Sequence, residues 1–326
     1  MYRIIRLFVI VFVVMLVAGC AFVNLGSLMG KRDLSESTVE KDSHWFVSDK
    51  VLLVDISGVI AEGAGGGLLS LGGATCSPDY VRAVLVKARK DSLIRAVVLR
   101  IDSPGGTVTA SELIAREIKR YRQETGIPVY AQITGLGCSG GYYIAAACDR
   151  IHIQKAGITG SIGVIASFPN YRKLADKVGY DQTVVKSGDL KDIGSPMRPM
   201  SDEEKAVFQA MINESYVQFL AWIVANRPQV GTVEVLKPIA DGRIYTAEQA
   251  LKNHLVDQIA FLDETLEAVK QAAKISRADI ITYGYNLSED ANMYTPSAAA
   301  KGLRLTDVEL PLPARRAGMY YLWGGY

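Results

Sequence analysis

Runs of apolar, β-branched residues alternate with amphipathic stretches through most of the chain. The apolar runs predict buried strands at residues 51–60, 94–102, 127–135, 150–154 and 182–188. The amphipathic stretches predict helices at residues 77–91, 107–122, 142–149, 171–179, 201–226, 246–260 and 263–273. Strands that alternate with helices in this way are typical of an α/β domain.

Local signals define the ends of several of these elements. Ser77 followed by Pro78 is typical of a helix N-terminus, and Ser201 three residues before Glu204 predicts a capping box. His152 lies between two isoleucines of a predicted strand. The alternation predicts that its side chain faces solvent.

The two ends of the chain differ from the middle. An apolar run after Arg3 and Arg6 indicates an export signal or a membrane anchor, and the residues before Cys20 resemble a bacterial lipobox, in which the cysteine receives a lipid. We therefore divide the chain into a signal or anchor (1–19), a linker (20–48), a globular domain (49–275) and a tail (276–326). This organisation places the domain on the extracytoplasmic side of a bacterial membrane.

Composition excludes some classes of function. The chain has 326 residues, 49% of them hydrophobic, and its formal net charge of +2 is accounted for by the two N-terminal arginines. Without a basic stripe, nucleic acid is not an expected partner. The remaining cysteines, at 76, 138 and 148, are odd in number, and we interpret them as small buried residues rather than a disulfide framework.

Residues 137–141 read GCSGG and fit the pattern of a nucleophile elbow, which exposes a serine hydroxyl at a strand-to-helix turn. Ser139 would need a base to remove its proton. A helix N-cap is the alternative role for this serine. Of the three histidines, only His254 could complete an esterase triad, and it lies within a predicted helix.

Five longer blocks carry a family resemblance: IDSPGG at 101–106, CSGGYYIAAACDRI at 138–151, TGSIGVI at 159–165, KSGDLKDIGSP at 186–196 and DGRIYTAEQALKNHLVD at 241–257. In these blocks, which span about residues 50–266, the chain resembles the short, single-copy form of the SppA-type signal peptide peptidases. The resemblance implies a Clp protease/crotonase-like spiral of β-β-α units. It also implies a membrane-tethered serine endopeptidase that hydrolyses cleaved signal peptides and other short apolar peptides.

The resemblance also implies roles for individual residues. Lys191 matches the family's general base, so Ser139 and Lys191 would form a Ser/Lys dyad without a metal or cofactor. The backbone N–H groups of Gly106 and Gly140 would form the oxyanion hole. Ser161 is a candidate for orienting the lysine amine. A lysine acts as a base only when neutral, and burial in an apolar pocket favours that form.

Two further expectations complete the hypothesis. In the family's two-copy form the lysine and the serine belong to different copies, so a one-copy chain would unite Ser139 of one protomer with Lys191 of the next in a closed ring. The apolar, glycine-rich loop at 65–73 is compatible with such packing. The alternatives are an esterase that uses His254, and a catalytically silent or crotonase-like scaffold subunit at the membrane.

Overall fold

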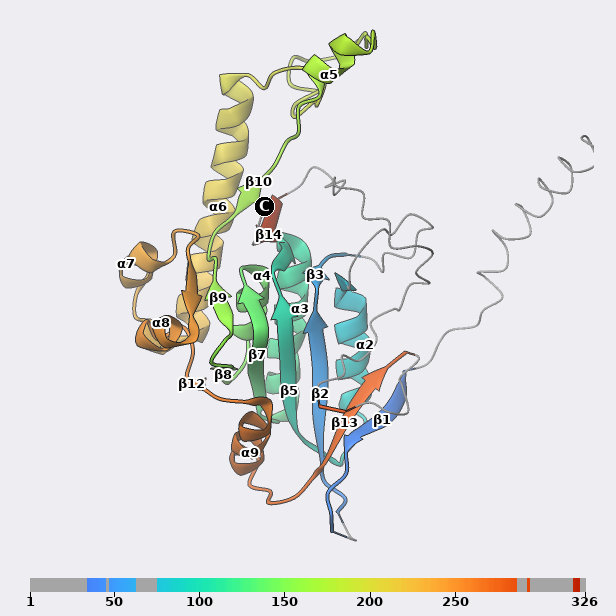
Figure 1. The fold of residues 1–326 in the computed structure, drawn as a ribbon, viewed down its shortest axis with the longest axis vertical. Helices are drawn as coiled ribbons and strands as arrows, with labels where there is room; N and C mark the ends of the chain where they lie inside the picture. The colour runs from blue at the N-terminus through green and yellow to red at the C-terminus, as the bar shows by residue number, and fades with distance from the viewer. Residues whose placement is uncertain (1–33, 45–46, 63–74, 286–291, 294–318, 323–326) are drawn as a thin grey trace, which may run out of the picture.

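The computed structural model describes residues 34–44, 47–62, 75–285, 292–293 and 319–322, and Figure 1 shows their arrangement. Cys20 and the loop at 65–73 lie outside the described residues. The chain is a mixed α/β structure, as predicted, built on a large sheet with helices on both faces. Within the described ranges, no helix has the length and apolar character needed to cross a membrane.

Nine strands form the main sheet, and seven follow one path in the order β1-β13-β2-β5-β7-β8-β12. Their bounds are β1 (Ser35–Glu40), β2 (Lys50–Ser57), β5 (Ile94–Ser103), β7 (Val129–Cys138), β8 (Arg150–Ile153), β9 (Ile158–Gly160), β11 (Ile244–Thr246), β12 (Gln258–Ile259) and β13 (Asp279–Gly284). Along that path every pair is parallel except β1 with β13, while β9 pairs parallel to β7 and antiparallel to β11. Central parallel strands covered on both faces explain the continuous apolar runs in the sequence.

A smaller sheet lies beyond the carboxyl ends of β2 and β5, in the order β10-β14-β6-β3-β4. Its strands are β3 (Val59–Ile60), β4 (Thr75–Cys76), β6 (Gly105–Thr107), β10 (Ile165–Ala166) and β14 (Met319–Leu322). β3 and β6 each follow directly on a strand of the main sheet. The chain therefore turns from one sheet into the other at the point where a site is expected in such folds.

The helices are α2 (Pro78–Ala88), α3 (Val108–Thr125), α4 (Gly140–Ala145), α5 (Arg172–Lys177), α6 (Asp202–Asn226), α7 (Val233–Leu236), α8 (Ala247–Lys252) and α9 (Leu262–Ala272). Two short 3-10 turns follow α6 and α7, at Pro228–Val230 and Lys237–Ile239. Ser77 caps α2, and Ser201 with Glu204 forms the predicted capping box of α6. The long helix therefore begins and ends where the sequence placed it.

Alternate side chains of the strands pack into two cores. Leu52, Val97 and Leu99 face the side covered by α2 and α3, in a cluster that continues to α4 and α6. Val51 and Val98 face the opposite side, where they pack against α9. The three described cysteines are free and buried, as the sequence indicated.

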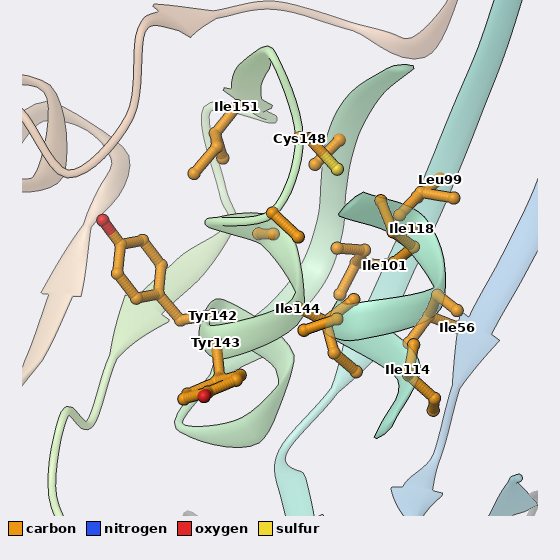
Figure 2. Packing of buried hydrophobic residues seen from close by; sticks show 14 of the residues in the cluster. Ile56, Leu99, Ile101, Ile114, Ile118, Tyr142, Tyr143, Ile144, Cys148 and Ile151 are labelled. Atoms are coloured by element: carbon orange, nitrogen blue, oxygen red, sulfur yellow. The ribbon is translucent and has the colours of Figure 1, made fainter. Parts of the chain in front are cut away.

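Helix α4 is enclosed on every side. Figure 2 shows Ile144 on the side of α4 that faces Ile101 and Ile114, while Tyr142 points the other way. The Tyr142 hydroxyl donates to the carbonyl oxygen of Leu255 at 2.8 Å. All six residues of the helix are buried. The element that follows Ser139 is therefore held firmly in the body of the protein.

The prediction for His152 was wrong. Its side chain is 3% exposed, because α9 covers this face of β8. The ring nitrogen Nδ1 lies 2.9 Å from the Thr265 hydroxyl of α9, and that hydroxyl donates to the side-chain oxygen of Gln132. Burial lowers the pKa of His152 from its ordinary value. Alternation along a strand shows which residues share a face, but not whether a distant helix covers it.

The apolar run at 182–188 does not form the predicted strand. These residues are exposed and lie in an irregular segment between α5 and α6. Figure 1 shows that this segment, α5 and the first half of α6 project beyond the two sheets. We call this projection, residues 167–212, the arm. The main sheet also takes in β1 and β13, which come from stretches that the sequence pattern left without regular structure.

Candidate active site

Ser139 lies at the turn between β7 and α4, the strand-turn-helix context that a nucleophile elbow requires. Its backbone has φ 52° and ψ −113°, a conformation that a residue with a side chain adopts only under strain. The Ser139 N–H donates to the carbonyl oxygen of Gly160 at 2.8 Å. The residue is 1% exposed, whereas the elbow pattern had predicted an exposed hydroxyl. Its hydroxyl makes no capping hydrogen bond to α4, which argues against the helix N-cap role.

The turn needs small residues around the serine. A side chain at Gly141 would put a Cβ 3.1 Å from the carbonyl oxygen of Ser103, which is closer than most real contacts of this kind. Gly140 is the first residue of α4, so its N–H is one of the groups at a helix N-terminus that lack a partner within the helix. A negative charge that develops near Ser139 would be stabilised there.

Gly105 and Gly106 form most of the short strand β6, which packs against α4. The sequence pattern predicted no strand at this point. Gly106 pairs with Ile60 of β3, and a Cβ at Gly106 would come within 1.8 Å of the Ile60 carbonyl oxygen. The close passage of β3 is therefore the reason that only glycine fits. The buried Ser103 hydroxyl accepts from the Gly105 N–H at 3.1 Å and donates to the Gly58 carbonyl oxygen at 2.6 Å.

Ser161 lies close to the Ser139 turn in the same protomer. It follows Gly160, whose carbonyl oxygen accepts the Ser139 N–H, and its own N–H donates to the Arg243 carbonyl oxygen at 2.7 Å. Ser161 is buried and has φ 50°. Ser139 and Ser161 are two of the four non-glycine residues with positive φ in the described part of the chain. Backbone strain of this kind concentrates at functional sites.

Lys191 is not brought to Ser139 within one protomer. It lies in the arm, between α5 and α6, and its side chain is exposed. Figure 1 shows this segment at the far end of α6, well away from α4. Among the residues that the structure describes, the only hydrogen bond of Lys191 joins its backbone N–H to the Gly188 carbonyl oxygen at 3.1 Å.

The histidine required by the esterase alternative is not at the site. The sequence had predicted that His254 lies within a helix. α8 ends at Lys252, so His254 lies after this helix instead. It is exposed, with φ 57°, and its N–H donates to the Leu251 carbonyl oxygen. Within the described ranges, no three His, Cys, Asp or Glu side chains are grouped as they would be around a metal ion.

Comparison with known proteins identifies the family. The profile of Peptidase family S49 matches residues 121–276. A candidate signal peptide peptidase SppA from Enterococcus faecium is 33% identical over 279 residues, which are 85% of this chain and 79% of that protein. The chain belongs to peptidase family S49.

Two other relatives extend the comparison. A candidate protease from Methanocaldococcus jannaschii is 38% identical over 215 residues, which cover 66% of this chain and 67% of that protein. Protease 4 from Haemophilus influenzae is 32% identical over 234 residues, which cover 70% of this chain and 35% of that protein. All three names describe peptidases, and the resemblance to SppA-type peptidases is confirmed.

Two features of this S49 chain were missed at the level of sequence. The first is β14, which lies between β6 and β10 and pairs antiparallel with both. In this ladder Tyr321 is the partner of Gly106. The aromatic residues near the C-terminus were visible in the sequence, but nothing local indicated where they would pair.

The second missed feature is an ion-pair network in the arm. Arg198 contacts both Asp192 and Glu204, and Lys186 contacts Asp192. The Arg198 guanidinium, followed by the Lys186 ammonium, holds the pKa of Asp192 well below its usual range, and Arg198 lowers the pKa of Glu204 to about 2. The alternating charges of residues 186–204 were a signal for this network, but only the fold shows which charges meet.

Proposed function

We propose that this S49 peptidase is a serine endopeptidase in which Ser139 is the nucleophile and Lys191 the general base. One observation carries the proposal: Ser139 is buried and strained at a strand-to-helix turn, with the glycine strand β6 packed against the helix that follows it. This arrangement offers a nucleophile and backbone donors on adjacent elements.

The chemistry follows from these groups. The Ser139 hydroxyl oxygen attacks the peptide carbonyl carbon, and its proton moves to the neutral Lys191 amine. The oxyanion that forms accepts hydrogen bonds from the N–H groups of Gly106 and Gly140. When the tetrahedral intermediate collapses, Lys191 returns the proton to the leaving amine. Water, deprotonated by Lys191, then hydrolyses the acyl-enzyme. Ser161 orients the lysine amine through its hydroxyl.

The lysine comes from a neighbouring protomer. Two observations support this part of the proposal: Lys191 is exposed at the far end of the arm, and the arm bears apolar side chains that nothing in the described chain covers. The most exposed of these are Leu174, Val178, Tyr180 and Val185. Burial of this surface against a second copy would exclude water from Lys191 and favour its neutral form. Head-to-tail contacts of this kind close into a ring.

The substrates are short apolar peptides in extended form, including cleaved signal peptides. The pairing of β14 with Gly105–Thr107 supports this, because it shows that β6 accepts an extended chain as an antiparallel neighbour. A peptide that took the place of β14 would bind by the same main-chain hydrogen bonds. The name of the Enterococcus faecium relative favours signal peptides among such substrates.

The N-terminal segment tethers the enzyme to the extracytoplasmic face of a bacterial membrane, with Cys20 as the site of lipid attachment. This proposal rests on the apolar run and on the small residues before Cys20. Replacement Cys20→Ala is expected to release the chain from membranes after expression in a bacterium that processes lipoproteins. Intact-mass measurement of the wild type should show the lipid. An unmodified wild-type Cys20 would instead favour an uncleaved anchor.

Complementation tests the shared dyad. Ser139→Ala and Lys191→Ala chains are each expected to be inactive alone. When they are co-expressed and mix at random, about a quarter of the interfaces in a head-to-tail ring would unite an intact serine with an intact lysine. Hydrolysis of a synthetic signal peptide, followed by mass spectrometry, should therefore recover in the mixture. Mixed oligomers that remain inactive would show that both residues act within one chain.

A further inference from the structure

The Arg198 side chain links the segment that carries Lys191 to α6. Arg198 Nε donates to Asp192 Oδ2 at 3.0 Å, and Arg198 Nη2 donates to Asp192 Oδ1 at 2.9 Å. The same guanidinium contacts Glu204, with Nη1 donating to Oε2 at 2.8 Å and Nη2 to Oε1 at 2.5 Å. A planar guanidinium is the side chain best suited to bind two carboxylates in this way.

Glu204 provides a fixed anchor. Its side chain is 1% exposed, and Oε2 also accepts the Ser201 N–H at 2.7 Å in the capping box of α6. α6 has 25 residues, and its second half packs on α4: the Trp222 ring stacks on Tyr143 with centroids 5.0 Å apart. The chain of contacts therefore runs from the helix behind Ser139, along α6, to the segment that presents Lys191.

Both oxygens of Asp192 are occupied. Oδ1 accepts from Lys186 Nζ at 2.8 Å in addition to Arg198, and Oδ2 accepts from Arg198. Asp192 is the residue next to Lys191 in the chain. A free carboxylate at this position would stabilise the ammonium form of a neighbouring lysine and so oppose its action as a base.

We propose that Arg198 is a positioning residue for Lys191: it fixes the Lys191 segment to α6 and keeps the Asp192 carboxylate engaged away from the lysine amine. The inference rests on the proposed role of Lys191 as general base. It adds that Lys191 stays neutral only while the Asp192 carboxylate is bound by the Arg198 guanidinium.

In the part of the chain that the structure describes, five charged residues lie around Asp192, and one of them offers a control variant. Lys186, Asp189 and Arg198 come from its own segment, Glu204 comes from α6, and Arg172 of α5 lines the same small cavity as Asp192 and Arg198. Arg172 pairs with Asp176 at 2.9 Å and with Asp181 at 3.7 Å, and within the described residues it forms no ion pair with Asp192. It is therefore a matched control: an arginine on the same arm with a different partner.

The test measures kcat/KM against pH for hydrolysis of a synthetic signal peptide by the full chain. Arg198→Ala is expected to lower kcat/KM near neutral pH by about 10-fold or more. It should also move the acid limb of the profile up by about one pH unit, because an Asp192 carboxylate held by Lys186 alone favours the protonated lysine. Arg198→Lys should move it in the same direction by less, since one ammonium cannot bind both carboxylates. Arg172→Ala should leave the limb in place.

The double variant Arg198→Ala/Asp192→Asn distinguishes an effect of Arg198 on Lys191 from a loss of activity caused by a less stable fold. Removal of the Asp192 carboxylate should return the acid limb to its wild-type pH even though the Arg198 guanidinium is absent. An Arg198→Ala profile that is lower at every pH but not displaced would overturn the inference, as would one equal to Arg172→Ala. If Arg198→Ala does not fold by circular dichroism, Arg198→Lys carries the same test.

Lys191→Ala in the same assay distinguishes a wrong role for Arg198 from a wrong role for Lys191. If Lys191→Ala is inactive while the Arg198 variants match the control, only the role of Arg198 is wrong. If Lys191→Ala retains wild-type activity, the proposed base is wrong, and the inference about Arg198 is lost with it.

Discussion

The arm, residues 167–212, and the rest of the described chain, which we call the body, are built in different ways. In the body, Ser139, Gly106, Gly140 and Ser161 are held by buried strands, tight glycine contacts and helix α4, whose residues are all buried. In the arm, Lys191 is exposed, and surface ion pairs with an apolar, uncovered face take the place of a core. In the proposed mechanism, the groups around the nucleophile therefore lie together in one chain, whereas the base lies apart from them.

This difference has a physical consequence. A buried core fixes a serine within its own protomer, because close packing leaves the turn no alternative arrangement. The arm holds the Lys191 segment by ion pairs but leaves the lysine exposed, and in the proposed assembly this lysine would be buried only against another protomer. Changes in the body should therefore affect activity and folding together, whereas changes in the arm should affect activity and assembly without unfolding the body.

The largest effect is expected from Lys191→Arg. An arginine keeps its proton throughout the accessible pH range and cannot act as a base. Activity on a signal peptide should be almost abolished, with the oligomer intact by light scattering. Lys177→Arg, an exposed lysine of α5, is the control and should be unaffected. A Lys191→Arg enzyme of near wild-type rate would remove Lys191 from the mechanism.

The next effect concerns the glycine strand. A Cβ at residue 106 meets the Ile60 carbonyl oxygen at 1.8 Å, so Gly106→Ala must displace β3 or β6. We expect a loss of about 2–4 kcal/mol in the free energy of unfolding and a loss of activity of about 100-fold or more. Gly188→Ala, which has no heavy atom within 4 Å of the added Cβ, provides the comparison for stability by urea unfolding. Equal stability of the two variants would contradict this reading of β6.

A smaller effect is expected when the apolar face of the arm is made charged. Val185 is 95% exposed, so Val185→Asp costs the isolated chain little but would bury a charge in an interface. Sedimentation should show smaller oligomers, and activity should fall with them while circular dichroism is unchanged. Val235→Asp, an exposed valine of α7 in the body, should leave both intact. Assembly that survives Val185→Asp would place the interface elsewhere.

The smallest effect concerns His152 in the body. Burial lowers its pKa in the folded chain, so the unfolded chain binds the proton more readily as pH falls through the ordinary value near 6.5. The contribution of neutral His152 is therefore present above that pH and decreases below it. Between pH 7.5 and 5 the wild type should lose up to about 1 kcal/mol more stability than His152→Gln in urea unfolding. Identical slopes for the wild type and His152→Gln would contradict the burial argument.

The sequence by itself determined most of what local pattern encodes. The central strands are apolar on both faces, the capping box at Ser201 begins α6, and the strand-to-helix turn at Ser139 follows from its glycines. Gly106 and Ser161 were singled out through family resemblance, and their roles stay predictions. The fold shows that the Ile60 carbonyl oxygen leaves no room for a side chain at 106, and that the Ser139 N–H donates to the carbonyl oxygen of Gly160, the residue before Ser161.

Only the tertiary structure decided what depends on distant parts of the chain. α9 buries His152, which alternation had placed in solvent. Residues 182–188 lie exposed in the arm and pair with no strand of the described chain. The pairing of β14 with β6 has no local signature, and the alternating charges of residues 186–204 do not show that Arg198 meets both Asp192 and Glu204. Periodicity records which side chains share a face, but contacts across long separations are decided by the fold that brings those faces together.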